Sequence, residues 1–322
     1  MLKLKLIRII ILITPIAILL SSLYFYSHLE AIKLKAHTSS IFDLGVYTEE
    51  PDKNFKLKRE DGLEIGASVY GTKEKVVKPG IILLHGHTTL GRMFPLYRVL
   101  SSKLAARGYI VLSIDLAGFG ESGDPFQFYT VEALDKTKEV SAALSYLKSL
   151  RNLDKNKIYV VAHSGGTKTA IKFALMNEEI KKIVAIEPPR TRASVQDRQY
   201  SWERLRKIRK SRYHKDFPEW YTMELHQRLN SDKYIDTYFD YFSRERHKPI
   251  LLFNGELEEG KSKLILENFY TQIKEPKGYY VIKNSDHYLN VFEYKGMVFY
   301  NKKVINDLIN HIDVWLGEGL VQ

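Results

Sequence analysis

The hydrophobic positions of this chain fall into short uninterrupted runs separated by longer, mostly amphipathic segments. Short apolar runs bounded by turn residues are typical of strands buried on both faces of a parallel sheet. Such runs lie at 81–84, 109–114, 157–162, 182–186, 249–253 and 278–282. Helices are expected between and after them at 94–107, 131–150, 166–176, 261–273 and 302–316. Repeated strand–helix units predict an α/β fold with a doubly wound, mainly parallel sheet.

Two further segments modify this regular pattern. Strand-like runs at 55–60 and 63–70 flank Asp61-Gly62, a strong signal for a hairpin that adds antiparallel strands at one edge of the sheet. Residues 188–247 are polar, basic and aromatic, and they interrupt the strand–helix rhythm. We interpret them as a helical cap inserted into an α/β core that comprises residues 53–187 and 248–322.

The N-terminus has a different character from the rest of the chain. Residues 9–26 form an uncharged run, long enough for a membrane-spanning helix, and the run ends in Tyr24-Phe25-Tyr26. We expect an anchor at 1–27 and a polar stalk at 28–52. A cleaved signal peptide is the alternative, although no small-x-small cleavage site follows the run. The basic residues Lys3, Lys5 and Arg8 favour a single-pass topology with a cytoplasmic N-terminus and an extracytoplasmic catalytic body.

Composition removes several classes of function. The chain has no cysteine, which excludes disulfides, thiolate metal sites and cysteine nucleophiles. The net charge is +11, but residues 190–215 hold ten Lys/Arg against Asp197 and Glu203, so the excess is largely local. Without a recognised motif, this charge does not predict nucleic-acid binding. Residues 201–215 form a basic amphipathic segment, which suits a solvated cap helix or a surface for anionic lipid.

The central chemical motif is Ala162-His163-Ser164-Gly165-Gly166, at the junction of a predicted strand and a predicted helix. A nucleophilic serine at this position needs a sharp turn that projects its hydroxyl from the sheet edge. Small residues two before and two after the serine allow strand and helix to pack closely there. Alanine stands at the first position, where glycine is usual. We interpret Ser164 as the nucleophile.

A serine hydroxyl needs a base, and the base needs a carboxylate that orients it. His287 ends the polar segment Asn284–His287 after the last predicted strand, which suits the base. Glu258 follows the strand at 249–253 and a glycine turn, and we choose it as the acid. Three other glutamates remain alternatives, namely Glu256, Glu259 and Glu187.

Attack on a carbonyl also creates an oxyanion, which requires two N–H donors. We expect one from Gly165, directly after the nucleophile, and the other from His87 in the loop that follows the strand at 81–84. The pair His85-x-His87 also offers two side chains of a type that binds metals. Thr89 and Leu90 stand where further ligands would be needed, so no metal and no cofactor are predicted.

These motifs together resemble the α/β-hydrolase family. The matching segments are His85-Gly86-His87, Asp115–Ser122, Ser164, Glu258 and His287, in the order serine, acid, histidine. The resemblance is to capped serine esterases, lipases and peptidases, and it implies an α/β-hydrolase fold and cleavage of a carboxylic ester through an acyl-enzyme. A small-molecule or lipid-like acyl compound is the implied substrate. A peptidase or amidase, or a non-catalytic membrane-tethered binding protein, are the alternatives.

Overall fold

The main sheet contains eight strands among the residues described by the computed structural model, which are 2–123, 135–188, 203, 206–207, 223, 248–258, 270–271, 273–274 and 276–317. In chain order the strands are β2 (Lys53–Lys58), β3 (Glu64–Tyr70), β4 (Lys78–Leu84), β5 (Ile110–Ile114), β6 (Leu153–His163), β7 (Ile180–Ile186), β8 (Ile250–Gly255) and β9 (Lys277–Ile282). Their order across the sheet is β2-β3-β5-β4-β6-β7-β8-β9. All pairs from β5 to β9 are parallel, whereas β2 and β3 add antiparallel pairs at one edge. The predicted fold class is confirmed.

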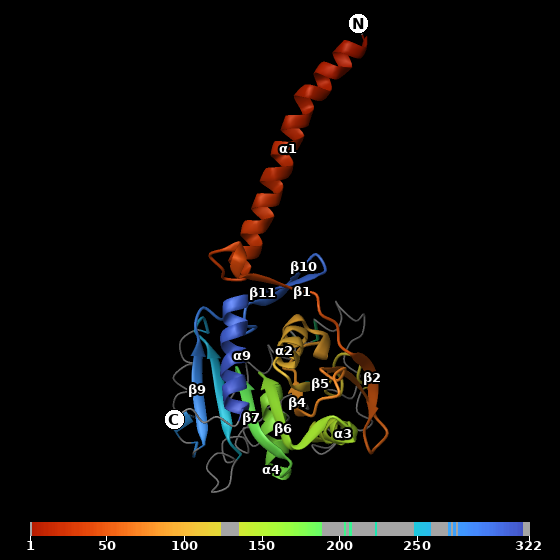
Figure 1. The fold of residues 1–322 in the computed structure, drawn as a ribbon, viewed down its shortest axis with the longest axis vertical. Helices are drawn as coiled ribbons and strands as arrows, with labels where there is room; N and C mark the ends of the chain where they lie inside the picture. The colour runs from red at the N-terminus through yellow and green to blue at the C-terminus, as the bar shows by residue number, and fades with distance from the viewer. Residues whose placement is uncertain are drawn as a thin grey trace.

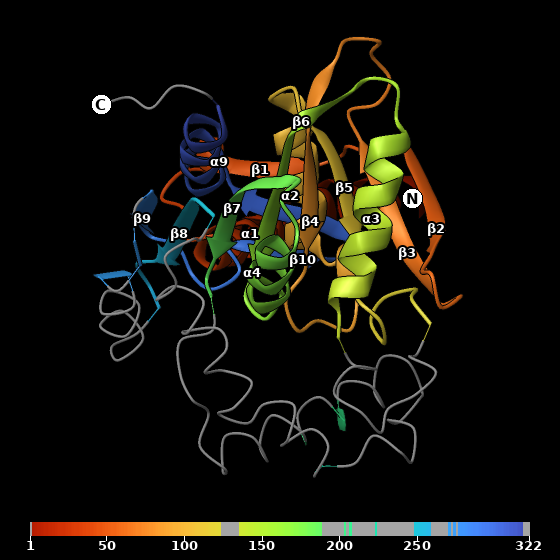
Figure 2. The ribbon, with the colours of Figure 1, turned by 90° about the horizontal axis from the view of Figure 1, so that it is seen from below.

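Helices cover both faces of this sheet because its central strands are apolar on both sides. Ile82 and Leu84 of β4 pack into a core with α3 (Thr137–Ser149) and α4 (Gly166–Met176). Their neighbours Ile81 and Leu83 pack into a second core with α2 (Pro95–Ala106) and α9 (Lys302–Leu316). The alternation follows from the two-residue period of a strand. Viewed from below, α3 and α4 lie in front of the sheet, with α2 and α1 beyond it (Figure 2).

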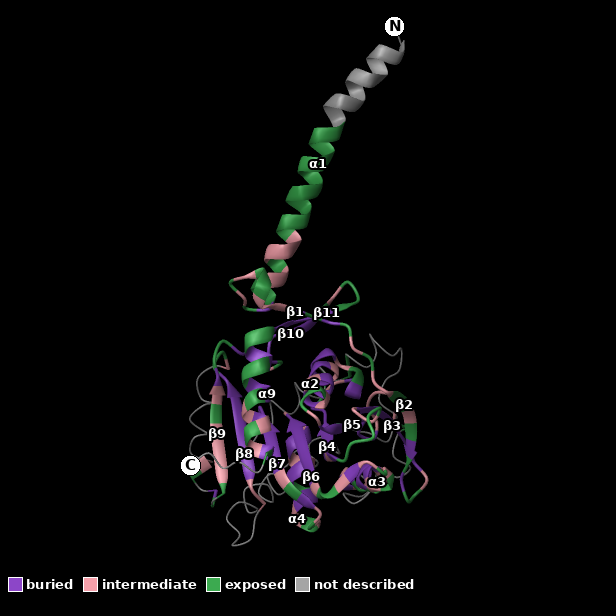
Figure 3. Cartoon of the chain, viewed as in Figure 1, coloured by how far each residue is buried: buried purple, intermediate pink, exposed green. Residues whose placement is uncertain are grey.

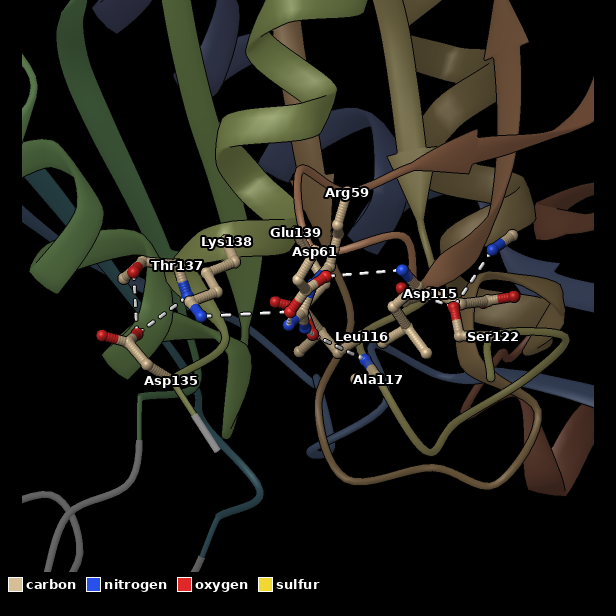
Figure 4. A network of polar contacts seen from close by, with 12 residues as sticks. Arg59, Asp61, Asp115, Leu116, Ala117, Ser122, Asp135, Thr137, Lys138 and Glu139 are labelled. Carbon is tan, nitrogen blue, oxygen red and sulfur yellow. Dashed lines mark hydrogen bonds and ion pairs between the residues drawn. The ribbon is translucent and has the colours of Figure 1, made fainter. Parts of the chain in front are cut away.

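The loop after β5 is fixed by buried polar contacts. Glu139 of α3 is fully buried, and its Oε1 accepts hydrogen bonds from Arg59 Nη1 at 3.0 Å and from the Ala117 amide at 3.1 Å. Ser122 Oγ donates to the Asp115 carbonyl at 2.9 Å and accepts from the Gly66 amide at 3.0 Å (Figure 4). The segment Asp115–Ser122 is therefore held by contacts with α3 and β3.

A second, three-stranded sheet lies outside the predicted pattern. It consists of β1 (Leu44–Tyr47), β11 (Met297–Asn301) and β10 (Val291–Tyr294), all antiparallel. Lys295 and Gly296 join β10 to β11 with φ of 50° and 78°, the left-handed conformation that a two-residue hairpin turn requires. The short 3-10 helix η1 (Ile41–Asp43) precedes β1. We call η1, β1, β10 and β11 the collar.

The N-terminal helix α1 (Leu2–Lys35) projects from the body at the collar (Figure 1). Its segment 14–35 is the one helix in the described part of the chain that is long and apolar enough to cross a membrane, with a mean hydropathy of 1.2. A signal sequence has the same properties. The range 28–52, where we expect a polar stalk, contains the end of α1, η1 and β1. The helix continues to Lys35, and η1 and β1 then pack against the body because β1 pairs with β11.

Other expectations fall on parts of the chain that are not described. The cap at 188–247, with the basic segment 201–215, lies almost entirely outside the described residues. The same holds for most of the helix expected at 261–273 and for Glu259. The helix expected at 131–150 begins at Thr137, and of the preceding residues 135 and 136 are described and are not helical.

Candidate active site

Ser164 occupies a strained turn between β6 and α4. Its φ is 47°, a left-handed conformation that is uncommon for a residue with a side chain. The Ser164 amide donates to the Ile186 carbonyl at 2.8 Å, and the Ser164 carbonyl accepts from Thr167 Oγ1 at 2.7 Å. A Cβ on Gly166 would meet the carbonyl oxygen of His85, so the position two after the serine has no room for a side chain. These constraints hold the turn on which the hydroxyl is presented.

His287 lies beside this hydroxyl, with its Nε2 3.2 Å from Ser164 Oγ. It belongs to the loop between β9 and β10, and that loop is tied internally. Asp286 Oδ1 accepts from the amides of Tyr288 at 2.9 Å and Asn290 at 2.8 Å, and Asn290 Nδ2 donates to the Asn284 carbonyl at 2.6 Å. The predicted serine–histidine pair is thus assembled at the carboxyl ends of the parallel strands.

Two carboxylates face the other ring nitrogen of His287. Glu258 Oε1 lies 3.3 Å from Nδ1, and Glu187 Oε2 lies 3.8 Å from it. Burial disfavours the imidazolium, but hydrogen bonding and charge from Glu187 and Glu258 outweigh it and raise the pKa of His287 from 6.5 to about 9. Glu258 has the better distance, whereas Glu187 is fully buried, so its charge is less screened by water.

Backbone contacts hold Glu187 and Glu256 in different places. Glu187 has φ of 48°, directly after β7, and its Oε1 accepts a short hydrogen bond from the Gly255 amide. Glu256 Oε2 accepts from the Asn284 amide at 2.8 Å, so it supports the histidine loop from outside. The geometry brings Glu258 and Glu187 to the histidine and gives Glu256 another role. Their catalytic assignment stays a prediction.

The loop after β4 packs against the turn that contains Ser164. A Cβ on Gly86 would come within 2.8 Å of the Ser164 Cβ, and a Cβ on Gly165 would come within 3.1 Å of the His87 ring. His85 is buried, its Nδ1 bonds to the Gly86 carbonyl at 2.6 Å, and its Nε2 accepts from the Leu116 amide at 2.9 Å. The two residues expected to form the oxyanion hole therefore adjoin each other and Ser164, while their donor role stays a prediction.

A buried bridge of side chains connects this loop to the histidine loop, and sequence reasoning did not find it. Tyr97 Oη accepts from the Gly86 amide at 2.7 Å and contacts His163 Nδ1 at 2.9 Å, and His163 Nε2 contacts the His287 carbonyl at 2.8 Å. A carbonyl only accepts, so His163 carries its proton on Nε2, and Tyr97 donates to Nδ1. Burial and the charge of His287 lower the pKa of His163 to about 3.

The sequence holds only part of the signal for this bridge. His163 lies inside the serine motif, beside the nucleophile, but Tyr97 is one aromatic residue on a predicted helix. Only the tertiary contacts show that these two side chains join the Gly86 loop to the His287 loop.

A metal ion has one geometrically suitable set of ligands among the described residues. Glu187, Glu258 and His287 each offer an atom within 4.8 Å of the others. Both nitrogens of His85 are engaged in hydrogen bonds, so His85-x-His87 would have to break them to bind a metal. In the Glu187–Glu258–His287 group, the proton on His287 supplies the positive charge that the two carboxylates attract.

Comparison with known proteins identifies the family and the fold. Residues 81–289 match the alpha/beta hydrolase family. No curated protein matches the chain. The chain is similar in structure to DcsB, solved with a substrate analogue, with a TM-score of 0.61 and 14% identity, over 82% of this chain and 98% of DcsB.

Two further solved structures are similar over most of their length. The Pyrococcus furiosus esterase Pf2001 has a TM-score of 0.51 and 21% identity, over 71% of this chain and 80% of that chain. Est1E from Butyrivibrio proteoclasticus, solved with ferulic acid bound, has a TM-score of 0.56 and 16% identity, over 83% of this chain and 100% of that chain. At these identities the structures show a common fold.

Proposed function

Since the chain belongs to the alpha/beta hydrolase family, we propose that it is a serine hydrolase that cleaves carboxylic esters and is held at a membrane by α1. The observation that carries the chemistry is the contact of 3.2 Å between Ser164 Oγ and His287 Nε2, at a turn where Ser164 has φ of 47°. A serine aligned with a histidine, itself facing carboxylates, is the arrangement that nucleophilic acyl transfer needs.

In the first half of the reaction, Ser164 Oγ attacks the ester carbonyl carbon while its proton moves to His287 Nε2. The amides of Gly165 and His87 stabilise the oxyanion. When the tetrahedral intermediate collapses, the carbon–oxygen bond of the ester breaks. His287 gives its proton to the departing alkoxide, which leaves as an alcohol.

In the second half, His287 takes a proton from water, and the resulting hydroxide attacks the acyl group on Ser164. Collapse of this intermediate returns the proton to Ser164 Oγ and releases the carboxylic acid. Glu258, 3.3 Å from His287 Nδ1, orients the ring and stabilises its cation in both halves. Glu187, fully buried at 3.8 Å, adds a second negative charge.

Ester cleavage is favoured over amide cleavage by the similarity to a structure described as an esterase, Pf2001. Turnover of short-chain nitrophenyl esters compared with aminoacyl anilides separates the two activities. Faster hydrolysis of the anilides would replace the esterase proposal by a peptidase or amidase.

A fluorophosphonate probe tests the nucleophile directly. We expect stoichiometric labelling of the intact protein, no labelling of Ser164→Ala, and full labelling of the control Ser149→Ala, whose serine is exposed at the end of α3. Failure to label the folded wild-type protein, or equal labelling of Ser164→Ala, contradicts the enzyme proposal and favours a non-catalytic binding protein.

The membrane anchor is supported by the exposed, apolar segment 14–35 of α1, which has none of its candidate span buried in the protein. Lys3, Lys5 and Arg8 favour a cytoplasmic N-terminus and an extracytoplasmic body. Carbonate extraction of membranes is the test. Full-length protein is expected in the pellet, and its release into the supernatant would contradict a spanning helix.

A further inference from the structure

The anchor helix is tied to the catalytic body at the collar. Ala36, directly after α1, is fully buried against Phe292 and Phe299 of the small sheet. Asn301 Nδ2 donates to the carbonyls of Ala36 at 3.2 Å and His37 at 3.1 Å. Asn301 Oδ1 meanwhile accepts from the amide of Lys303 in the first turn of α9 at 2.9 Å. One side chain therefore links the end of α1 to the start of α9.

The hairpin of the collar reaches back along the anchor. Lys295, in the turn between β10 and β11, places its Nζ 3.2 Å from the hydroxyl of Tyr24. The rings of His28 and Tyr294 lie 6.0 Å apart. Tyr24 belongs to the aromatic end of the apolar run 9–26, where a spanning helix meets the headgroups. With the uncharged run 9–26 as the spanning part of α1, the hairpin turn lies near the level at which α1 leaves the bilayer.

The collar exposes large apolar side chains around the base of α1. Phe42 is 84% exposed, Met297 51% and Ile41 47%. Figure 3 shows α1 exposed over residues 14–27 and partly covered at its lower end, where it meets this region. Exposed apolar residues beside a membrane anchor can be buried in the interfacial layer of a bilayer.

The collar and the adjoining ends of α1 and α9 contain more lysines than carboxylates. Five lysines are set against three carboxylates: Lys33, Lys35, Lys295, Lys302 and Lys303 against Glu30, Asp43 and Glu293. Two of these carboxylates pair with two of these lysines, with Glu30 2.7 Å from Lys33 and Asp43 3.1 Å from Lys303. The remaining excess is complementary to the phosphates of anionic lipids.

We propose that the collar is a lipid-docking surface, seated in the headgroup layer of a bilayer that contains anionic lipids, with Phe42 and Met297 inserted and Lys295 at the phosphates. The occupant follows from continuity with α1 and from charge, and the inference rests on the membrane anchoring proposed for α1. His287 precedes Lys295 by eight residues, which span at most about 29 Å when fully extended. Docking thus fixes the catalytic histidine within about 30 Å of the headgroups.

The absence of native cysteine allows a direct test in the full-length protein. Single cysteines at Phe42→Cys and Met297→Cys receive an environment-sensitive fluorophore, and the protein is reconstituted in vesicles of phosphatidylcholine and phosphatidylglycerol. Met176→Cys is the matched control, because Met176 is 70% exposed at the end of α4, across the sheet from α1 (Figure 1). We expect a headgroup spin-labelled lipid to quench positions 42 and 297 at least about twofold more than position 176.

Charge is tested in the same vesicles. Lys295→Glu, or replacement of phosphatidylglycerol by phosphatidylcholine, is expected to lower quenching at position 297 toward the control value. Equal quenching at 297 and 176 in carbonate-resistant protein would overturn the docking surface and leave the anchor intact. Protection from aqueous iodide without lipid quenching would overturn it in favour of a second copy of the chain. Release of the protein by carbonate would contradict both the membrane anchor and the docking surface. Fluorophosphonate labelling of Ser164 tests the hydrolase proposal separately.

Discussion

The pH dependence of catalysis should expose the two carboxylates that face His287. The pKa of this histidine is raised from 6.5 to about 9, because Glu187 and Glu258 together outweigh the effect of burial. Only the neutral ring accepts the proton of Ser164, and at pH 7 that form is roughly 1% of the free enzyme. We therefore expect kcat/KM to rise about tenfold per pH unit from pH 7 and to level off near pH 9.

We call the part of the pH profile in which kcat/KM rises its acidic limb. Replacing one carboxylate should shift this limb to lower pH. Glu258→Gln removes the charge at 3.3 Å from Nδ1, and we expect the apparent pKa to fall by about one unit or more. The plateau should fall as well, on the order of 100-fold or more, because the ring loses a partner that fixes its tautomer. Glu187→Gln should also lower the pKa, since its fully buried charge lies at 3.8 Å.

The assay is kcat/KM for a nitrophenyl ester from pH 6 to 10, with the rate of fluorophosphonate labelling as a second measure that is independent of product release. Glu256→Gln is the matched control, because Glu256 bonds to the Asn284 amide and should leave the limb unchanged. An apparent pKa near 6.5 in the wild-type profile would refute the inference that the two carboxylates raise the pKa of His287. An unmoved limb in Glu258→Gln, with a moved one in Glu187→Gln, would transfer the role of the acid to Glu187.

The remaining predictions concern the frame of the site. Tyr97→Phe removes the hydroxyl between the Gly86 loop and His163, so kcat should fall about tenfold with little change in KM or in the pH limb, because the charges on His287 remain. Burial lowers the pKa of His85 and of His163 to about 3. Below pH 6.5 both rings therefore stay neutral in the folded protein, whereas they bind protons in the unfolded chain. Urea unfolding should then show a loss of about 2 kcal/mol between pH 6.5 and 5.5, about half of it in His163→Gln. Gly166→Ala places a Cβ against the His85 carbonyl, and we expect it to lower the free energy of unfolding by about 2 kcal/mol and to slow fluorophosphonate labelling.

Local pattern was sufficient for the elements of the main sheet. A strand that is buried on both faces must be apolar throughout. The predicted run at 81–84 accordingly forms the C-terminal part of β4. The three strands of the collar were not predicted from local pattern. The turn Lys295-Gly296 between two apolar runs resembles the Asp61-Gly62 hairpin that was predicted, and it is the signal that would have revealed β10 and β11. The pairing of β11 with the distant β1 has no local signal at all.

The sequence by itself determined the position of the candidate nucleophile. A serine on a sharp strand-to-helix turn requires small neighbours, which is a constraint on adjacent residues, and Gly166 proved to be packed against the His85 carbonyl. His287 could be placed for a similar reason, because it lies on the loop after the last strand of the main sheet.

Only the tertiary structure decided which groups surround that histidine. Glu187 and Glu258 follow β7 and β8, which are neighbours in the parallel sheet, so both carboxylates reach His287 from positions far apart in the chain. The bridge through Tyr97 and His163 arises in the same way. Through-space distance sets hydrogen bonds and charge, and a parallel sheet brings together at one edge residues that the sequence separates.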